Sequence, residues 1–205
     1  DRNNERLCYD SSTQTFAVEM PTWAHGSGFD WFQDWLFEMR VQGYISRGSL
    51  SPRPDITLKG SSGRFSGRYV AYSLTVIAVC TNSAPSVALK VRFSETYNQL
   101  IADADLLLEG SQGKIRVVIL VHEYNPASGT RQKRGGRKTL YPIPRDHAQQ
   151  CITLKWDDIV RDNMDLLLLQ PTPPPPALML DELRKCVDGG LKRHLITGAM
   201  CQERI

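Results

Sequence analysis

The chain has 205 residues, of which 41% are hydrophobic and 23% are charged, as is ordinary for a soluble globular protein. Its net charge of +3 is compatible with a nucleic-acid partner but does not indicate one. No run approaches the roughly 20 apolar residues that span a bilayer, and the polar start "DRNNERLCYD" lacks a signal-peptide core. We therefore expect no membrane partner and an intracellular protein of the cytoplasm or nucleus, although a processed secreted chain could begin in the same way.

The first third of the chain predicts one helix and little regular strand. The alternation in residues 15–20 predicts a short strand, and the turn-rich residues 21–29 predict a link. Residues 30–44 predict an amphipathic helix, because their large apolar side chains recur at helical spacing. Within the Gly-, Ser-, Pro- and Arg-rich residues 46–68, only "DITL" (55–58) predicts a strand.

The middle of the chain predicts a sheet. Residues 69–80 and 86–93 are β-prone, and residues 94–110 predict a helix that begins at a capping serine and ends at a glycine. The near-continuous apolar run 114–124 is typical of a strand buried on both faces at the centre of a sheet. Residues 150–159 predict a further strand, antiparallel to that one in a long hairpin.

A four-proline run, "PPPP" at 173–176, predicts a stiff spacer, with an SH3-type protein ligand as the alternative. An amphipathic helix is predicted after it, over residues 178–195. We therefore expect an α/β domain at 14–160, with a central mixed sheet flanked by helices, and a proline-rich linker with a C-terminal helix at 161–205. The pattern does not indicate an oligomeric state.

Two stretches carry the residue types of a metal-dependent nuclease. "SPRPDITLKG" (51–60) places Asp55 after a proline and before a short alternating run, and "SVALKVRFSE" (86–95) places Lys90 and Arg92 on one face of a strand. Phosphodiester cleavage by Mg²⁺ needs carboxylates that hold the ion near the phosphate, together with a cation that helps to orient the attacking hydroxide. An Asp on one strand and an acid-x-Lys pair on its neighbour would supply these groups.

The order "FAVEMPTWAHGSGFDWFQDWL…PRPDITL…SVALKVRFSETYNQLIADADLLLEGSQGKIRVVILVHEY…ITLKWDDI" resembles a large family of uncharacterised fungal proteins with a restriction-endonuclease-like, PD-(D/E)xK core. That family has a "P-x-W-x-H" segment, a "K-E-P-D" motif, a "V-x-E-V-G-x-S-E-S" strand, an "L-x-x-D-A-x-x-W-L" helix and a "G-x-V-K-V-V-I-L" strand. The match covers residues 16–124 well and 150–159 weakly.

The resemblance implies an ancestral catalytic site across adjacent strands. Asp55 falls on the Pro-Asp aspartate and is the implied metal ligand, Glu95 falls in the "S-E-S" segment, and Asp103 falls on the helix aspartate. Lys90 stands where the family has its strand glutamate, and Arg92 stands at the Gly or Lys position two residues later. A lysine offers no anionic ligand and repels a divalent ion.

The spacing also departs from the family pattern. Asp55 and Lys90 are 35 residues apart, whereas the resemblance implies some twenty. The excess corresponds to residues 68–84, for which the family pattern has no counterpart. Mg²⁺ is therefore expected as a cofactor only if the protein is catalytically active.

The segment "RQKRGGRK" (131–138) concentrates five cations without an acid: Arg131, Lys133, Arg134, Arg137 and Lys138. A solvated loop is the simplest interpretation, and a nuclear-import or nucleic-acid patch is the alternative. Three hypotheses follow. The chain is a nuclease-derived protein that binds DNA or RNA without efficient cleavage, through a cationic strand face of Lys90 and Arg92 and through residues 131–138. Alternatively, it is an active Mg²⁺-dependent nuclease that uses Asp55 and Glu95, or a non-enzymatic interaction module or effector.

The remaining enzyme classes have no motif here. There is no GxSxG, no phosphate-binding loop and no dinucleotide glycine fingerprint. Five scattered cysteines without a CxxC pair predict free thiols in a reducing compartment rather than zinc ligands.

Overall fold

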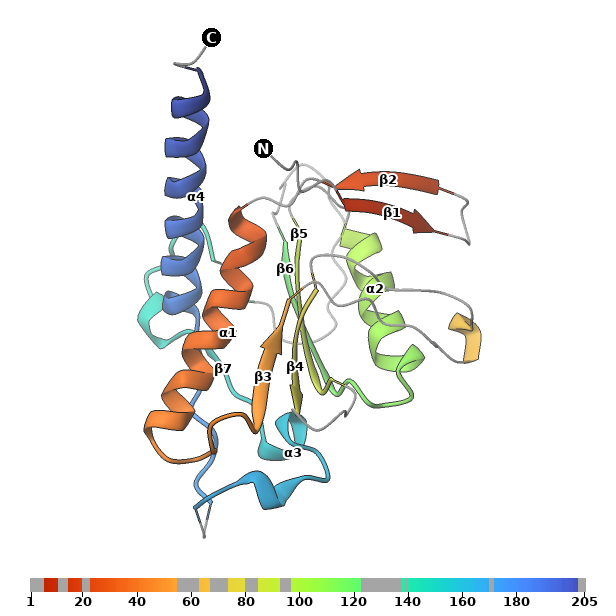
Figure 1. Ribbon diagram of the computed structural model, residues 1–205, viewed down its shortest axis with the longest axis vertical. Coiled ribbons are helices and arrows are strands. Elements are labelled where there is room, and N and C mark those ends of the chain that lie inside the picture. Colours follow the sequence, from red (N-terminus) through yellow and green to blue (C-terminus); the bar gives the residue numbers. More distant parts are fainter. Residues whose placement is uncertain are drawn as a thin grey trace.

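The structure is a computed structural model that describes residues 6–10, 15–19, 23–54, 63–66, 74–79, 85–92, 97–122, 138, 140–169 and 172–202. Its centre is a mixed sheet of four strands, β3 (Leu50–Arg53), β4 (Leu74–Val79), β5 (Val87–Arg92) and β6 (Val117–His122), which lie in that order (Figure 1). β3, β4 and β5 run antiparallel to one another, and β5 and β6 run parallel. The crossover between the two parallel strands is α2 (Tyr97–Gly110).

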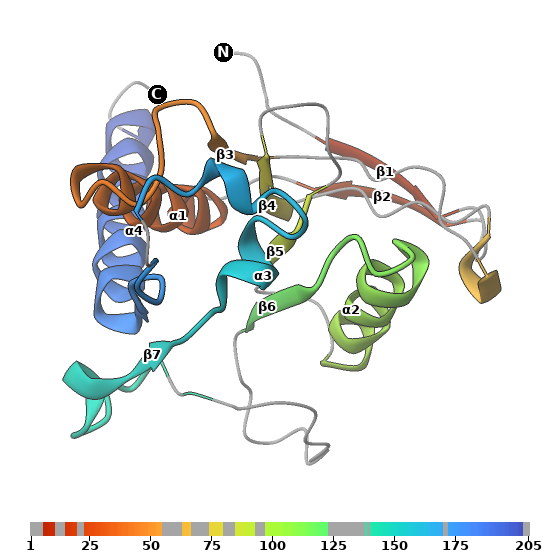
Figure 2. The ribbon, with the colours of Figure 1, turned by 90° about the horizontal axis from the view of Figure 1, so that it is seen from below.

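Helices cover both faces of this sheet. α1 (Trp23–Val41) and α4 (Leu180–Gln202) lie together on one face, and α2 lies on the other (Figure 2). The strand alternation divides β5 between the two layers. Val87, Leu89 and Val91 pack in the core beneath α1 and α4, whereas Ala88 packs in the smaller core beneath α2. The expected α/β class with a mixed sheet flanked by helices is confirmed.

α1 begins at Trp23 and not at Asp30, because tertiary packing overrides the turn signal of "HGSGF". The Ser27 hydroxyl is fully buried and donates to the Cys186 carbonyl of α4 at 3.0 Å. A Cβ atom at Gly28 would lie 2.6 Å from Leu89 Cδ2 on β5. The glycine that suggested a link is therefore what lets the helix approach the sheet.

β6 is the last strand of the described sheet and not its centre, so the prediction drawn from its continuous apolar run is wrong. The neighbour of β6 is β5, and three of its six residues, Val117, Val118 and Leu120, are partly exposed. Interior positions belong instead to β4 and β5. A run of apolar residues measures how much of a strand is covered, which is a different property from its place in the sheet.

The predicted strand at 150–159 is also corrected. Only Cys151–Ile152 form a strand, β7, and it pairs with β8 (Leu178–Met179) in a separate two-stranded sheet and not with β6. Residues Trp156–Ile159 form the short helix α3. The other small elements are the hairpin of β1 (Arg6–Asp10) and β2 (Thr15–Glu19) and the 3-10 turns η1 (Gly63–Phe65), η3 (His147–Gln149) and η4 (Met164–Leu166).

The C-terminal segment shares the main core. Leu180, Leu183 and Val187 of α4 lie in the same buried cluster as Trp31 and Leu36 of α1. The proline run before α4 is packed as well, with Pro175 buried, so it does not act as a free spacer. Among the described helices, none is both long enough and apolar enough to cross a membrane.

Candidate functional site

The structure places two of the predicted catalytic residues and leaves two outside the described residues. Asp55 and Glu95 belong to the second group. Arg92 is the last residue of β5, where its backbone pairs in register with His122 of β6. Lys90 lies among the described residues, on β5.

Lys90 lies on the α2 side of β5 and is 1% exposed. Its ammonium forms an ion pair with the carboxylate of Asp103 on α2, whose side chain is 28% exposed. Transfer of an ammonium into a protein interior is costly unless a partner neutralises it, and Asp103 supplies that charge. The predicted cationic strand face is therefore corrected at Lys90, because α2 covers this side chain and keeps it from any phosphate backbone at the surface.

The strand predicted at residues 55–58, which would carry Asp55, lies outside the described residues, so its adjacency to β5 stays a prediction. In the described sheet, β4 lies between β3, which ends at Arg53, and β5, which carries Lys90. Residues Leu74–Val79 of the stretch without a family counterpart thus form an interior strand of the sheet, and not an appended one. Val76 and Ile77 of β4 are fully buried, which makes this strand part of both cores.

The described residues do not fit a divalent metal at this place. Mg²⁺ takes oxygen ligands in octahedral geometry. At the strand position of the implied acid the chain has an ammonium group, and the carboxylate of Asp103 is engaged with it. Within the described residues, no group of three or more His, Cys, Asp or Glu side chains is arranged to hold an ion.

The basic segment is represented in the described residues by Lys138 alone, which is exposed. Arg131, Lys133, Arg134 and Arg137 lie outside them. The chain that follows this segment, residues 140–150, is described throughout and lies against the start of α4.

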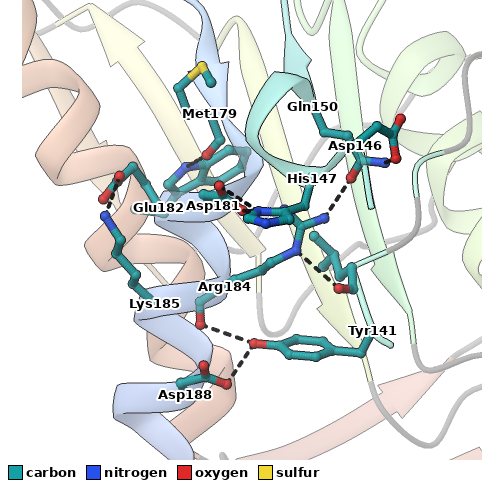
Figure 3. Close-up of polar contacts among 12 residues, drawn as sticks. Tyr141, Asp146, His147, Gln150, Met179, Asp181, Glu182, Arg184, Lys185 and Asp188 are labelled. Carbon is teal, nitrogen blue, oxygen red and sulfur yellow. Dashed lines mark hydrogen bonds and ion pairs between the residues drawn. The ribbon is translucent and has the colours of Figure 1, made fainter. Parts of the chain in front are cut away.

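A polar cluster that the sequence analysis did not predict joins residues 140–150 to α4; we call it the Arg184 cluster (Figure 3). Its members are Tyr141, His147, Gln150, Asp181, Arg184 and Asp188. Arg184 is 3% exposed and uses three nitrogens. Nε donates to the Leu140 carbonyl at 3.0 Å, Nη1 to Asp181 Oδ1 at 2.6 Å, and Nη2 to Gln150 Oε1 at 2.6 Å.

Two further side chains complete the cluster around Arg184. His147 Nδ1 lies 2.9 Å from both carboxylate oxygens of Asp181, and the Tyr141 hydroxyl lies 2.7 Å from Asp188 Oδ1 and 3.1 Å from the Arg184 carbonyl. The hydrogen bond with His147, aided by Arg184, holds the pKa of Asp181 below its ordinary value of 3.8. Burial, with the nearby Asp188 carboxylate, raises the pKa of the Tyr141 hydroxyl.

The sequence contained one half of the signal for this cluster. The i,i+3 spacing of Asp181 and Arg184 places them on one helix face. The other half, at residues 140–150, lies more than 30 positions away, and no periodicity links it to the helix. In comparisons with known proteins, no family model, curated protein or solved structure matches the chain.

Proposed function

We propose that this chain is a nuclease-derived protein that binds nucleic acid without efficient cleavage. The observation that carries the proposal is the ion pair between buried Lys90 and partly exposed Asp103, at the strand position where the PD-(D/E)xK resemblance implies a metal-binding acid. The mixed sheet flanked by helices is compatible with the restriction-endonuclease-like fold that the resemblance implies.

The ion pair argues against the second hypothesis, an active nuclease. The Lys90 ammonium supplies no oxygen ligand to a metal ion, and the Asp103 carboxylate is already engaged in neutralising it. An active site built from Asp55 and Glu95 alone would hold Mg²⁺ without the strand acid that the family pattern supplies at position 90.

Affinity for DNA or RNA is assigned to the basic segment, since Lys90 is covered. Five cations within eight residues can neutralise several phosphates and release their counterions, an interaction that does not depend on base sequence. The Arg184 cluster supports this assignment, because it fixes Leu140, two residues after Lys138, to a packed helix. A basic segment attached at a rigid point loses less conformational entropy on binding than a free tail does.

The binding test is fluorescence anisotropy with a short DNA duplex and a single-stranded RNA, over a series of salt concentrations. We expect log K to fall linearly with log[salt], and the variant Arg134→Gln/Arg137→Gln/Lys138→Gln to reduce that slope by about 2 to 3. Arg47→Gln/Lys114→Gln/Lys192→Gln removes the same charge from exposed positions elsewhere and should keep most of the affinity. Absence of binding by the wild type at low salt would favour the interaction-module hypothesis.

The cleavage test separates a lost active site from a hidden one. We expect no Mg²⁺- or Mn²⁺-dependent cleavage of plasmid DNA or RNA beyond that of Asp55→Ala. Lys90→Glu should create a carboxylate pair with Asp103, so Mn²⁺ should raise the melting temperature of this variant and not that of the wild type. Cleavage by the wild type that Asp55→Ala abolishes would establish the active-nuclease hypothesis instead.

A further inference from the structure

Three buried tryptophans bind the proline-rich segment through their indole N–H groups. Trp156 Nε1 donates to the Pro173 carbonyl at 2.6 Å, Trp35 Nε1 to the Pro176 carbonyl at 2.8 Å, and Trp31 Nε1 to the Met179 carbonyl at 3.0 Å. The three residues are 7%, 4% and 1% exposed. We call them the tryptophan ladder.

The carbonyl groups that accept these bonds are spaced three residues apart: 173, 176 and 179. Three residues make one turn of a polyproline II helix, so every third carbonyl of such a helix points the same way. Residues 173–175 each precede a proline, which disfavours the α conformation and favours the polyproline II region. The Pro173 and Pro176 acceptors are therefore one turn of this conformation apart, and Met179 of β8 follows at the same spacing of three residues.

The ladder belongs to the rigid part of the fold. Trp31 and Trp35 are one helical turn apart on α1, and Trp156 is the first residue of α3. Figure 1 shows the segment rising alongside the C-terminal half of α1 before it enters α4. The segment packs against the protein on one side, since Pro175 is buried whereas Pro174 is exposed. Aromatic side chains with a hydrogen-bond donor, on a fixed support, are the usual means by which proteins bind polyproline II ligands.

We propose that the tryptophan ladder is a polyproline-II-binding groove that the chain's own residues 173–179 fill, and that it accepts an extended proline-rich peptide in trans when this segment detaches. The partner class is a peptide with carbonyl groups free at every third residue of a proline run. This inference is independent of the proposed nucleic-acid function, because neither the basic segment nor Lys90 contributes to the ladder.

A peptide added in trans must compete with the chain's own residues 173–179 for the tryptophan ladder. A single hydrogen bond contributes on the order of 1 kcal/mol net, and detachment of the segment loses the three indole bonds together with the β7–β8 pairing and the burial of Leu178. The tethered segment also competes at a high effective concentration, on the order of millimolar for a short linker. The wild-type chain should thus bind an added peptide poorly, and weakening the segment should raise that affinity.

The test uses the full chain and the peptide PTPPPPALML, which copies residues 171–180. Pro174→Gly/Pro176→Gly keeps every carbonyl group but removes the conformational preference of the tethered segment. We expect the peptide to bind this variant about tenfold more tightly than the wild type. Binding is followed by the indole N–H signals of Trp31, Trp35 and Trp156 in nitrogen-15 NMR spectra.

Two controls assign the binding to the ladder. A peptide with glycine at the four positions of the proline run should not shift the indole signals. Trp35→Phe, placed in the glycine variant, should weaken peptide binding about fivefold, as expected for the loss of one hydrogen bond of about 1 kcal/mol. If the glycine variant is folded by circular dichroism and its indole signals do not respond to PTPPPPALML, the proposal is overturned.

A measurement on the wild type covers the case in which the glycine variant does not fold. Hydrogen exchange of the three indole N–H groups is compared with that of the Leu89 amide in the interior strand β5. We expect the Trp35 indole to exchange through a local opening that is more frequent than global unfolding. Exchange of all three indoles at the rate of global unfolding would show that the segment never leaves the groove, and would overturn the proposal.

Discussion

Lys90 and Arg184 are two buried cations on opposite sides of the sheet, and the fold satisfies them differently. Lys90, 1% exposed, projects from a strand and forms an ion pair with Asp103 on the helix above it. Arg184, 3% exposed, projects from a helix and donates to a backbone carbonyl, a carboxylate and a side-chain amide. The ammonium pairs with a carboxylate on the neighbouring helix, whereas the guanidinium distributes its donors over three acceptors in residues 140–150 and α4.

The chemistry of the two cations accounts for this difference. An ammonium is a compact, strongly hydrated charge, so its burial requires a nearby anion. A planar guanidinium with five N–H donors can connect groups that are far apart in sequence, as Leu140, Gln150 and Asp181 are. The Lys90–Asp103 pair connects α2 to β5, and Arg184 connects residues 140–150 to α4.

The largest effect is expected from Asp103→Ala, which leaves the Lys90 ammonium buried without this carboxylate. Loss of one partner of a buried ion pair typically costs about 3 to 5 kcal/mol of unfolding free energy. Urea unfolding measures this loss, with an unchanged m value as the sign that the folded state is otherwise retained.

The matched control for this prediction is Glu109→Ala on the same helix. Glu109 lies 2.8 Å from Arg64 and both side chains are exposed, so this contact should contribute less than about 1 kcal/mol. The double variant Lys90→Met/Asp103→Leu replaces the pair by apolar groups and should recover most of the lost stability. Equal losses for Asp103→Ala and Glu109→Ala would show that Lys90 is not held by the pair.

A smaller loss of unfolding free energy is expected from Arg184→Lys, which keeps the charge and removes the planar guanidinium group. An ammonium on a flexible stem cannot donate in the three directions that Arg184 uses, so a buried acceptor such as Gln150 Oε1 is left without its donor. Each such buried group costs about 1 to 3 kcal/mol, and urea unfolding should show a loss of about 2 kcal/mol.

Lys185→Arg is the control for Arg184→Lys, because Lys185 is exposed and pairs with Glu182 one turn away at 2.7 Å. This reverse exchange should change the unfolding free energy by less than about 0.5 kcal/mol. The comparison between the two cations fails if Arg184→Lys is as mild as its control, since the distribution of donors would then be of no consequence.

Local sequence patterns predicted much of the fold. The alternation along β5 and the apolar stripe of α2 were sufficient to place both elements, because each pattern reflects burial of one face. The same rule failed at the start of α1, where Gly28 resembles a turn residue and is required by the 2.6 Å approach of Leu89. A pattern within one element does not contain the distance to its neighbour.

The candidate site was harder to predict for the same reason. Lys90 between Leu89 and Val91 suggested a strand with a solvated cationic face, but the alternation does not reveal what covers that face. Its partner Asp103 lies 13 residues later, on a helix that crosses above the strand. The Arg184 cluster joins segments still farther apart, so only the tertiary structure brings its members together.

The smallest effect at neutral pH is expected from His147→Gln. This variant tests the contribution of His147 to the Arg184 cluster through its stability at acidic pH. The hydrogen bond with His147 is the main cause of the lowered pKa of Asp181, and Arg184 adds to it. A carboxylate with a lowered pKa stabilises the fold above its ordinary pKa of 3.8, and this contribution is lost as the pH falls through the lowered value. In His147→Gln the pKa of Asp181 should rise toward 3.8, so the pH dependence of unfolding should become shallower below that pH.

Carbon-13 NMR titration of the Asp181 carboxyl group measures the shift directly, with Glu182→Gln on the same turn as the control. An unchanged titration in His147→Gln would mean that Arg184 alone holds this carboxylate, and the two cations would then differ less than their contacts suggest.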